Sequence, residues 1–156
     1  MFSASETSGR VSISVTAIFM GNDLNISLYG GDAPHIGAVA LAQPRPSLQN
    51  AKQNSSTCSV LTITGHKEDE LARALALDLS KKLEVTVCVA CGIHLDKISP
   101  EEIGLVLAIC DRLTAKLLTA LQENKMRNRP QSGSRGPGAR TARAKKSRAI
   151  DGNTLT

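Results

Sequence analysis

The chain has three histidines, and each lies shortly after a glycine at the end of a predicted strand: His35, His66 and His94. Imidazole can donate or accept a hydrogen bond, titrate near neutral pH or bind a metal. Glycine permits a tight turn and lets a ligand approach the backbone. A histidine in such a place can also simply close a strand or helix. Because all three follow one pattern, we expect them to converge on a single binding cleft.

The clearest local binding motif is Thr64-Gly65-His66-Lys67, which precedes a predicted helix over residues 67–83. A helix N-terminus presents unpaired amides and partial positive charge, and both favour phosphate. Gly65 would admit an anion and Lys67 adds charge. The spacing is not that of a Walker loop, and an ordinary strand-to-helix turn is the alternative.

Two further motifs contain the other histidines. In Gly92-Ile93-His94-Leu95-Asp96, His94 could ligate a metal or act as a base oriented by Asp96, although such a carboxylate can also be a plain loop acceptor. An irregular turn would place His35 near the edge of a pocket; its residues are Gly30, Gly31, Asp32, Ala33, Pro34, His35, Ile36 and Gly37.

Hydrophobic periodicity predicts the elements that must position these motifs. Alternating apolar residues predict strands over residues 11–19, 24–28, 36–42, 57–64 and 85–91, and apolar stripes predict helices over 67–83 and 100–124. We therefore predict an α+β fold, a mixed and mostly antiparallel five-stranded sheet (β-β-β-β-α-β-α) with two helices packed on it. One crossover is required, from the fourth strand to the fifth, and it should be right-handed.

Two segments carry further local signals. Ser99-Pro100-Glu101-Glu102 has the pattern of a capping box with proline in the first helical position. The helix that follows is more apolar than one sheet face requires, which indicates self-association or a well-buried helix. Residues 43–56, with two prolines, predict a long polar loop.

Charge divides the chain into a domain and a tail. Residues 125–156 hold nine basic residues and one acid, a net charge of +8, whereas residues 1–124 have a net charge of −3. We predict a flexible N-terminus over 1–9, a single α+β domain over 10–124 and a basic disordered tail over 125–156. The tail's basic cluster is Arg140, Arg143, Lys145, Lys146 and Arg148. It could attract an acidic surface, but it has no interleaved aromatic residue, which argues against nucleic-acid binding by stacking.

The four cysteines lie in apolar segments, and no stretch has the length of a membrane span or the pattern of a signal peptide. A cytoplasmic protein with reduced thiols is the simplest interpretation. Strand alternation puts Cys88 and Cys91 on opposite faces, which argues against a disulfide or a shared zinc ion.

Three ordered motifs within about residues 10–121 resemble the small D-subunit family associated with hydroxyarylic acid decarboxylases. They are Gly30-Gly31-Asp32-Ala33-Pro34-His35-Ile36-Gly37-Ala38-Val39-Ala40, Thr64-Gly65-His66-Lys67-Glu68-Asp69 and Gly92-Ile93-His94-Leu95-Asp96.

Members of that family are described as chaperones for prenylated flavin mononucleotide (FMN), the cofactor of the large decarboxylase subunit. The resemblance implies that prenylated FMN, or FMN itself, binds here, with residues 64–67 around the phosphate. His35, His66 and His94 would meet the ring edge or ribityl chain, Asp96 would fix a histidine tautomer, and aliphatic walls such as Ile36 and Ile93 would cover the ring.

The resulting hypothesis is a non-catalytic, homo-oligomeric accessory protein that delivers prenylated FMN to a decarboxylase. No evident nucleophile–base pair exists, so no catalytic residue is assigned. One alternative is a metal-dependent enzyme that uses His35, His66, His94 and Asp96. A second alternative is an oligomeric scaffold whose basic tail recruits an acidic partner.

Overall fold

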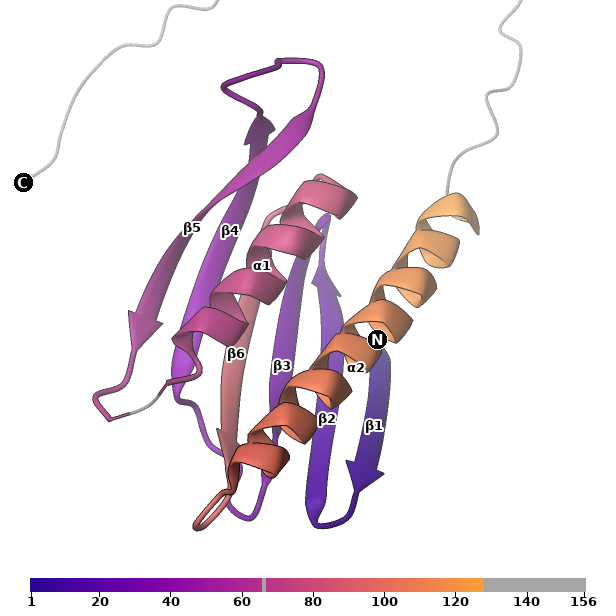
Figure 1. Cartoon of the computed structure of the whole chain (residues 1–156). Helices are drawn as coiled ribbons and strands as arrows, with labels where there is room; N and C mark the ends of the chain where they lie inside the picture. The colour runs from indigo at the N-terminus through magenta and orange to yellow at the C-terminus, as the bar shows by residue number, and fades with distance from the viewer. Residues whose placement is uncertain (66, 128–156) are drawn as a thin grey trace, which may run out of the picture.

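Both helices pack on one face of a six-stranded mixed sheet in the computed structural model, which describes residues 1–65 and 67–127 (Figure 1). The elements are β1 (Phe2–Ser8), β2 (Val11–Met20), β3 (Asp23–Gly31), β4 (Ala38–Pro46), β5 (Asn54–Thr62), α1 (Asp69–Leu83), β6 (Val87–His94) and α2 (Pro100–Arg127). The strand order is β1-β2-β3-β6-β4-β5, with β3 and β6 parallel and every other neighbouring pair antiparallel. The predicted α+β class is therefore confirmed, with six strands in place of five.

The additional strand is β1, formed by residues for which the sequence predicted a flexible N-terminus. It pairs with β2 along its whole length, with Ala4 opposite Val15, and a tight turn at Gly9 joins the two strands. Glu6, on its inward face, accepts hydrogen bonds from Arg112 and Lys116 of α2. β1 is short and rich in serine, so its own pattern is weak; pairing with β2 and packing under α2 stabilise it.

The β4–β5 hairpin is longer than predicted, because the polar loop of 43–56 shrinks to residues 47–53. Pro44 and Pro46 lie inside β4, opposite Ser56 and Asn54 of β5. Proline cannot donate to a neighbouring strand, but β4 pairs with β6 only as far as Ala42. Both prolines therefore occupy the part of β4 that has a neighbour on one side only.

The helices connect and cover the sheet. α1 carries the chain from β5 to β6, which run parallel with β4 between them, and it packs on those three strands. α2 packs on β1 and β2. The predicted capping box is confirmed, since the Ser99 amide donates to Glu102 at 2.9 Å and the Glu102 amide donates to the Ser99 hydroxyl at 3.2 Å. α2 runs to Arg127, past the predicted end, and residues 128–156 of the predicted tail lie outside the described part.

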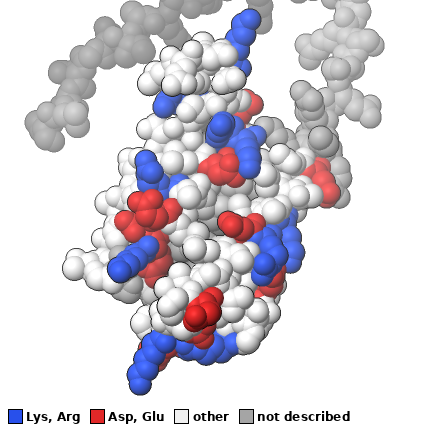
Figure 2. Space-filling model, in the orientation of Figure 1, with Lys and Arg blue, Asp and Glu red and all other residues white. Residues whose placement is uncertain are grey.

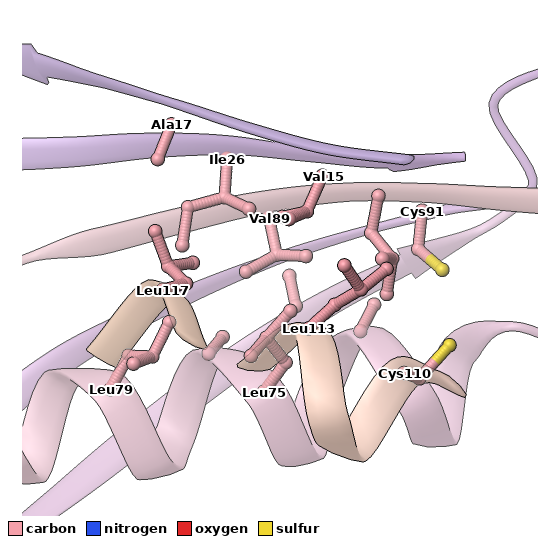
Figure 3. Close-up of a cluster of buried hydrophobic side chains, with 14 of the residues drawn as sticks. Val15, Ala17, Ile26, Leu75, Leu79, Val89, Cys91, Cys110, Leu113 and Leu117 are labelled. Atoms are coloured by element: carbon pink, nitrogen blue, oxygen red, sulfur yellow. The ribbon is translucent and has the colours of Figure 1, made fainter. Parts of the chain in front are cut away.

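The core lies between the helices and the sheet (Figure 3). Its largest fully buried side chains are Ile13, Leu24, Ile26, Leu28, Leu79, Ile109, Leu113, Leu117, Val11, Val15, Val87 and Val89. Cys91 of β6 and Cys110 of α2 turn their sulfur atoms toward each other, and burial raises the pKa of each thiol to about 12. Neither forms a disulfide, and Cys88 lies on the opposite face of β6, as alternation predicted.

The two faces of the molecule differ in charge. Figure 2 shows basic and acidic side chains side by side over the helices. On the other face of the sheet, the outward positions of β2, of β3 from Asn25 to Tyr29, of β6 from Cys88 to Ala90 and of β4 as far as Gln43 carry no charged side chain; Asp23 and His94 lie at the two ends of the same surface. The residues without charge are Ser12, Ser14, Thr16, Ile18, Asn25, Ser27, Tyr29, Val39, Leu41, Gln43, Cys88 and Ala90. We call them the open face.

Most of the apolar stripe of α2 packs into the core. Val106, Cys110 and Leu113 are buried, while Ile103 and Leu107 in the first turns stay about half exposed. Within the described residues, no helix has the length and apolar character needed to cross a membrane.

Candidate functional site

The three glycine–histidine motifs lie at one edge of the sheet. β3, β5 and β6 run in the same direction, so the loops that follow them emerge together with the starts of α1 and α2 (Figure 1, lower end). We call residues 30–37, 64–65, 67–68 and 92–96, at these strand ends and loops, the histidine edge. The sequence order of the motifs alone did not require this meeting; the strand directions produce it.

His35 and His94 come together at this edge. Their ring centroids are 6.1 Å apart, and the rings meet edge to face at 76°. His35 is partly covered, whereas His94 is exposed. His66, the third predicted member, lies outside the described residues. Two of the three expected side chains are thus adjacent, on the loop after β3 and the end of β6.

Two glycines make that approach possible. Each packs directly against the backbone of the segment that carries the other histidine, where a side chain would not fit. A Cβ atom on Gly92 would overlap the carbonyl oxygen of His35, and a Cβ atom on Gly31 would overlap the carbonyl oxygen of His94. Gly31 also adopts φ = +78°, which side chains rarely tolerate. These glycines therefore bring the two histidine segments together, whereas the sequence suggested that they leave room for a ligand.

The other three glycines of the predicted motifs also differ in whether a side chain would fit at their positions. A side chain on Gly30 would strike the backbone of β2, and one on Gly37 would lie 2.6 Å from the Glu68 carboxylate. A Cβ atom on Gly65, where φ is +91°, would instead meet no other group within 4 Å. Gly65 alone among these five glycines leaves room for an incoming group.

Glu68 is a site residue that the sequence analysis missed. Its carboxylate lies 3.5 Å from Nε2 of His35 and accepts hydrogen bonds from the amides of Lys67 at 2.9 Å and Ile93 at 3.4 Å. It thereby connects all three loops of the histidine edge. Its position directly before α1 was the available signal, but an acid there is also a common feature of helix starts.

His94 has a carboxylate partner, as predicted. Its Nε2 atom lies 3.0 Å from Oδ1 of Asp96. His35 differs, because its Nδ1 atom lies 3.1 Å from the carbonyl oxygen of Ala33. Each ring is therefore oriented by an acceptor from its own loop.

A family model for the prenylated flavin chaperone LpdD-like domain matches residues 7–122, which include all three motifs. The chain belongs to this family. A search of curated proteins found no match. The match also includes the hairpin turn after β1 and nearly all of α2, so the domain and the histidine edge fall within it together.

In this LpdD-like domain the phosphate motif differs from its predicted form. α1 begins at Asp69, two residues later than predicted, and its first turn contains Asp69 and Glu70 directly after Glu68. Three carboxylates thus accompany the helix N-terminus, and one accepts the Lys67 amide. The groups that remain turned outward for an anion are the exposed Thr64 hydroxyl, the open Gly65 and the exposed Lys67 side chain.

Apolar residues flank the histidine pair. Ile36 is 56% exposed and Ile63, across from Gly37 at the end of β5, is 51% exposed. Ile93 is half-buried beside His94. Pro34 is exposed on the turn before His35.

The structure also bears on the metal alternative. Within residues 1–65 and 67–127, which exclude His66, no group of three or more histidine, cysteine, aspartate or glutamate side chains could hold a metal ion. His35, His94, Glu68 and Asp96 instead contact one another and backbone groups.

Proposed function

We propose that this chain binds prenylated FMN at the histidine edge and delivers it to the large subunit of a prenyl-FMN-dependent decarboxylase. The observation that carries the proposal is the approach of His35 and His94 to a centroid distance of 6.1 Å, at one edge with the predicted phosphate motif. Membership of the prenylated flavin chaperone family supports the ligand class. The sequence offers no evident nucleophile–base pair, and the described groups at this edge are hydrogen-bonding groups, so we assign a carrier role.

The residues at this edge fit the parts of a flavin mononucleotide. Thr64, Gly65 and Lys67 offer an exposed hydroxyl, open backbone and positive charge for the phosphate. His35 and His94 offer ring nitrogens to the polar edge of the flavin or its ribityl chain. The cofactor, when bound, supplies the decarboxylation chemistry only after it reaches the partner enzyme.

Apolar cover for the flavin ring would come from isoleucine. Ile36 and Ile93 lie on the two histidine loops, and Ile63 lies beside Gly37. Tyr29, the chain's single tyrosine, pairs with Gly92 in register and is 38% exposed, so it adds ring surface near the same strand ends. This cover is mainly aliphatic, which suits a ring that is bound for a time and then released.

Titration of authentic prenylated FMN into the purified chain tests the binding step. We expect micromolar binding by the wild type and weaker binding by His35→Ala and His94→Ala, about tenfold for each loss of one good hydrogen bond, or ~1.4 kcal/mol. Lys82→Ala, which removes a cation from the far end of α1, is the matched control and should bind normally. A wild type that binds no prenylated FMN at micromolar concentration contradicts the proposal.

Delivery requires a separate experiment. The flavin-loaded chain is mixed with apo-decarboxylase, and decarboxylation is compared with that from the same amount of free prenylated FMN. We expect faster or more complete activation from the loaded chain. Equal activation from free cofactor would leave a flavin-binding protein without a delivery role.

We further propose that the chain forms a homo-oligomer through the open face. Depletion of charged residues is the compositional mark of an interface centre. The whole outer face of the six-stranded sheet, of which the open face is the central part, presents roughly 600–700 Å², near the roughly 800 Å² that each partner gives to a standard interface. Leu41→Lys, at a side chain that is 46% exposed, should yield monomers by light scattering, whereas Leu107→Lys on α2 should not. A wild-type monomer contradicts this part.

A further inference from the structure

Arg10, in the turn between β1 and β2, donates four hydrogen bonds at the border of the histidine edge. Its Nε and Nη2 atoms donate to the two oxygens of the Glu102 carboxylate at 2.7 and 3.0 Å. Its Nη1 atom donates to Oδ2 of Asp32 at 2.9 Å, and Nη2 donates also to the Asp96 carbonyl at 2.9 Å. Four of the five N–H groups of a guanidinium are thus committed to the protein.

The contacts of Arg10 converge on the segment that orients His94. Asp32 accepts from the Asp96 amide at 2.9 Å with the same oxygen that Arg10 contacts. Asp96 is therefore held at its amide by Asp32 and at its carbonyl by Arg10. Its side chain, fixed in this way, lies 3.0 Å from Nε2 of His94.

Asp32 also holds His94 directly, because its own amide donates to the His94 carbonyl at 2.6 Å. The Glu102 contacts add the start of α2 to the same network, since Glu102 also accepts from the Ser99 amide. One arginine thereby joins the β1–β2 turn, the end of β3, the loop after β6 and α2. The hydrogen-bond acceptor and the carboxylate beside His35, Ala33 and Glu68, are not among the groups to which Arg10 donates, and His35 meets this network through its ring contact with His94.

Stability alone does not explain such an arrangement. The Arg10 and Asp32 side chains are 43% and 38% exposed, and ion pairs this exposed contribute little to the free energy of unfolding. The forked guanidinium contacts do restrict direction, because a planar fork matches a carboxylate with both oxygens at once. The main effect of the network is therefore on geometry.

We propose that Arg10 is a positioning residue for His94, acting through Asp32 and Asp96. The inference rests on the proposed function, since it concerns the same ligand site. It distinguishes the two histidines of the histidine edge: Arg10 holds the loop that carries Asp96, the acceptor of His94, whereas His35 is oriented by Ala33 and Glu68.

The test follows the ring nitrogens of both histidines by 15N NMR in the full chain. In the wild type, the Asp96 contact favours the His94 tautomer with hydrogen on Nε2. In Arg10→Gln we expect the His94 ring signals to shift toward a tautomer mixture, with a smaller change at His35, whose ring contacts that of His94. Affinity for prenylated FMN should fall about tenfold, or ~1.4 kcal/mol. Arg10→Lys keeps the charge without the fork and should show the same shift, which covers the case of an Arg10→Gln chain that does not fold.

The matched control is Arg112→Gln. Arg112 also joins α2 to the β1–β2 hairpin through a glutamate, Glu6, but makes no described contact with the histidine edge. It should leave the His94 signals and the affinity unchanged. Unchanged His94 signals in both Arg10 variants overturn the inference, whether or not flavin binds. Shifted His94 signals in a chain that binds no flavin support the positioning role and contradict only the proposed function.

Discussion

The layer between helices and sheet and the histidine edge are built from different chemistry. The first consists of aliphatic side chains, many of them completely buried, and within the described residues no buried side-chain polar atom lacks a hydrogen-bond partner. The second consists of charged, histidine and glycine residues that contact one another near solvent. Apolar burial dominates folding free energy, whereas exposed polar contacts contribute little. If the proposed function holds, the residues that stabilise the fold are separate from those that bind the flavin.

The two regions meet at the strand ends. Gly31 and Gly92 belong to the sheet, yet each is in contact with the backbone of a histidine segment. Substitutions at these glycines should therefore lower both stability and flavin affinity, while substitutions elsewhere should lower only one of the two.

The largest expected effect is on stability, from Leu113→Ala. Leu113 of α2 is fully buried in the core between the helices and the sheet, so truncation leaves a cavity and should lower the free energy of unfolding by about 2–5 kcal/mol. Urea unfolding measures it, and flavin affinity of the folded fraction should stay unchanged. Leu107→Ala, on the same helix but 52% exposed, is the control and should lose far less. A loss of affinity in folded Leu113→Ala would break the separation of the two regions.

Gly92→Ala should affect both regions. The new methyl group would overlap the His35 carbonyl oxygen, so the loop after β3 must move away from His94. We expect a lower melting temperature together with loss of flavin binding at micromolar concentration. Gly104→Ala is the matched control: it lies in α2 with nothing within 4 Å, and alanine should stabilise the helix by up to about 1 kcal/mol. Normal binding by Gly92→Ala would contradict the role given to this glycine.

Lys67→Ala should change binding alone. Removal of one exposed cation should weaken prenylated FMN binding about tenfold, or ~1.4 kcal/mol, with the urea midpoint unchanged. Isothermal titration with FMN and with riboflavin, which lacks the phosphate, distinguishes the cause. FMN binding should fall and riboflavin binding should not; equal losses would place Lys67 away from the phosphate.

The smallest expected effect is on thermal stability at acidic pH. The Arg10 hydrogen bond lowers the pKa of Glu102 from its ordinary value of 4.5. A lowered pKa in the folded state means that the interaction stabilises the protein above pH 4.5 and is lost as the pH falls below it. Thermal melts from pH 7 to pH 3 should therefore decline less steeply for Glu102→Gln than for the wild type.

Glu6 provides the comparison for that experiment. Arg112 and Lys116 lower its pKa in the same direction, so Glu6→Gln should flatten the acid decline as well. The His94 ring signals distinguish the two variants, since Glu102 belongs to the Arg10 network and Glu6 does not. Identical His94 signals in both variants would weaken the link between this network and the histidine edge.

The sequence by itself determined the α+β class, the helix starts to within two residues, the capping box of Ser99 and Glu102, and the three motifs in order. Each follows from periodicity or from residues a few positions apart, so local chemistry is sufficient. The sequence also indicated self-association, from the apolar excess of α2. The structure buries most of that apolar stripe in the core. The surface with few charges is instead the open face of the sheet.

Tertiary structure decided the rest. β1 exists because β2 and α2 lie beside it, and Pro44 fits β4 because β6 begins opposite Ala42 and does not reach Pro44. The approach of His35 to His94, the position of Glu68 between loops and the reach of Arg10 to Glu102 join residues that are far apart in the chain. Such contacts depend on strand order and direction, which local patterns do not encode.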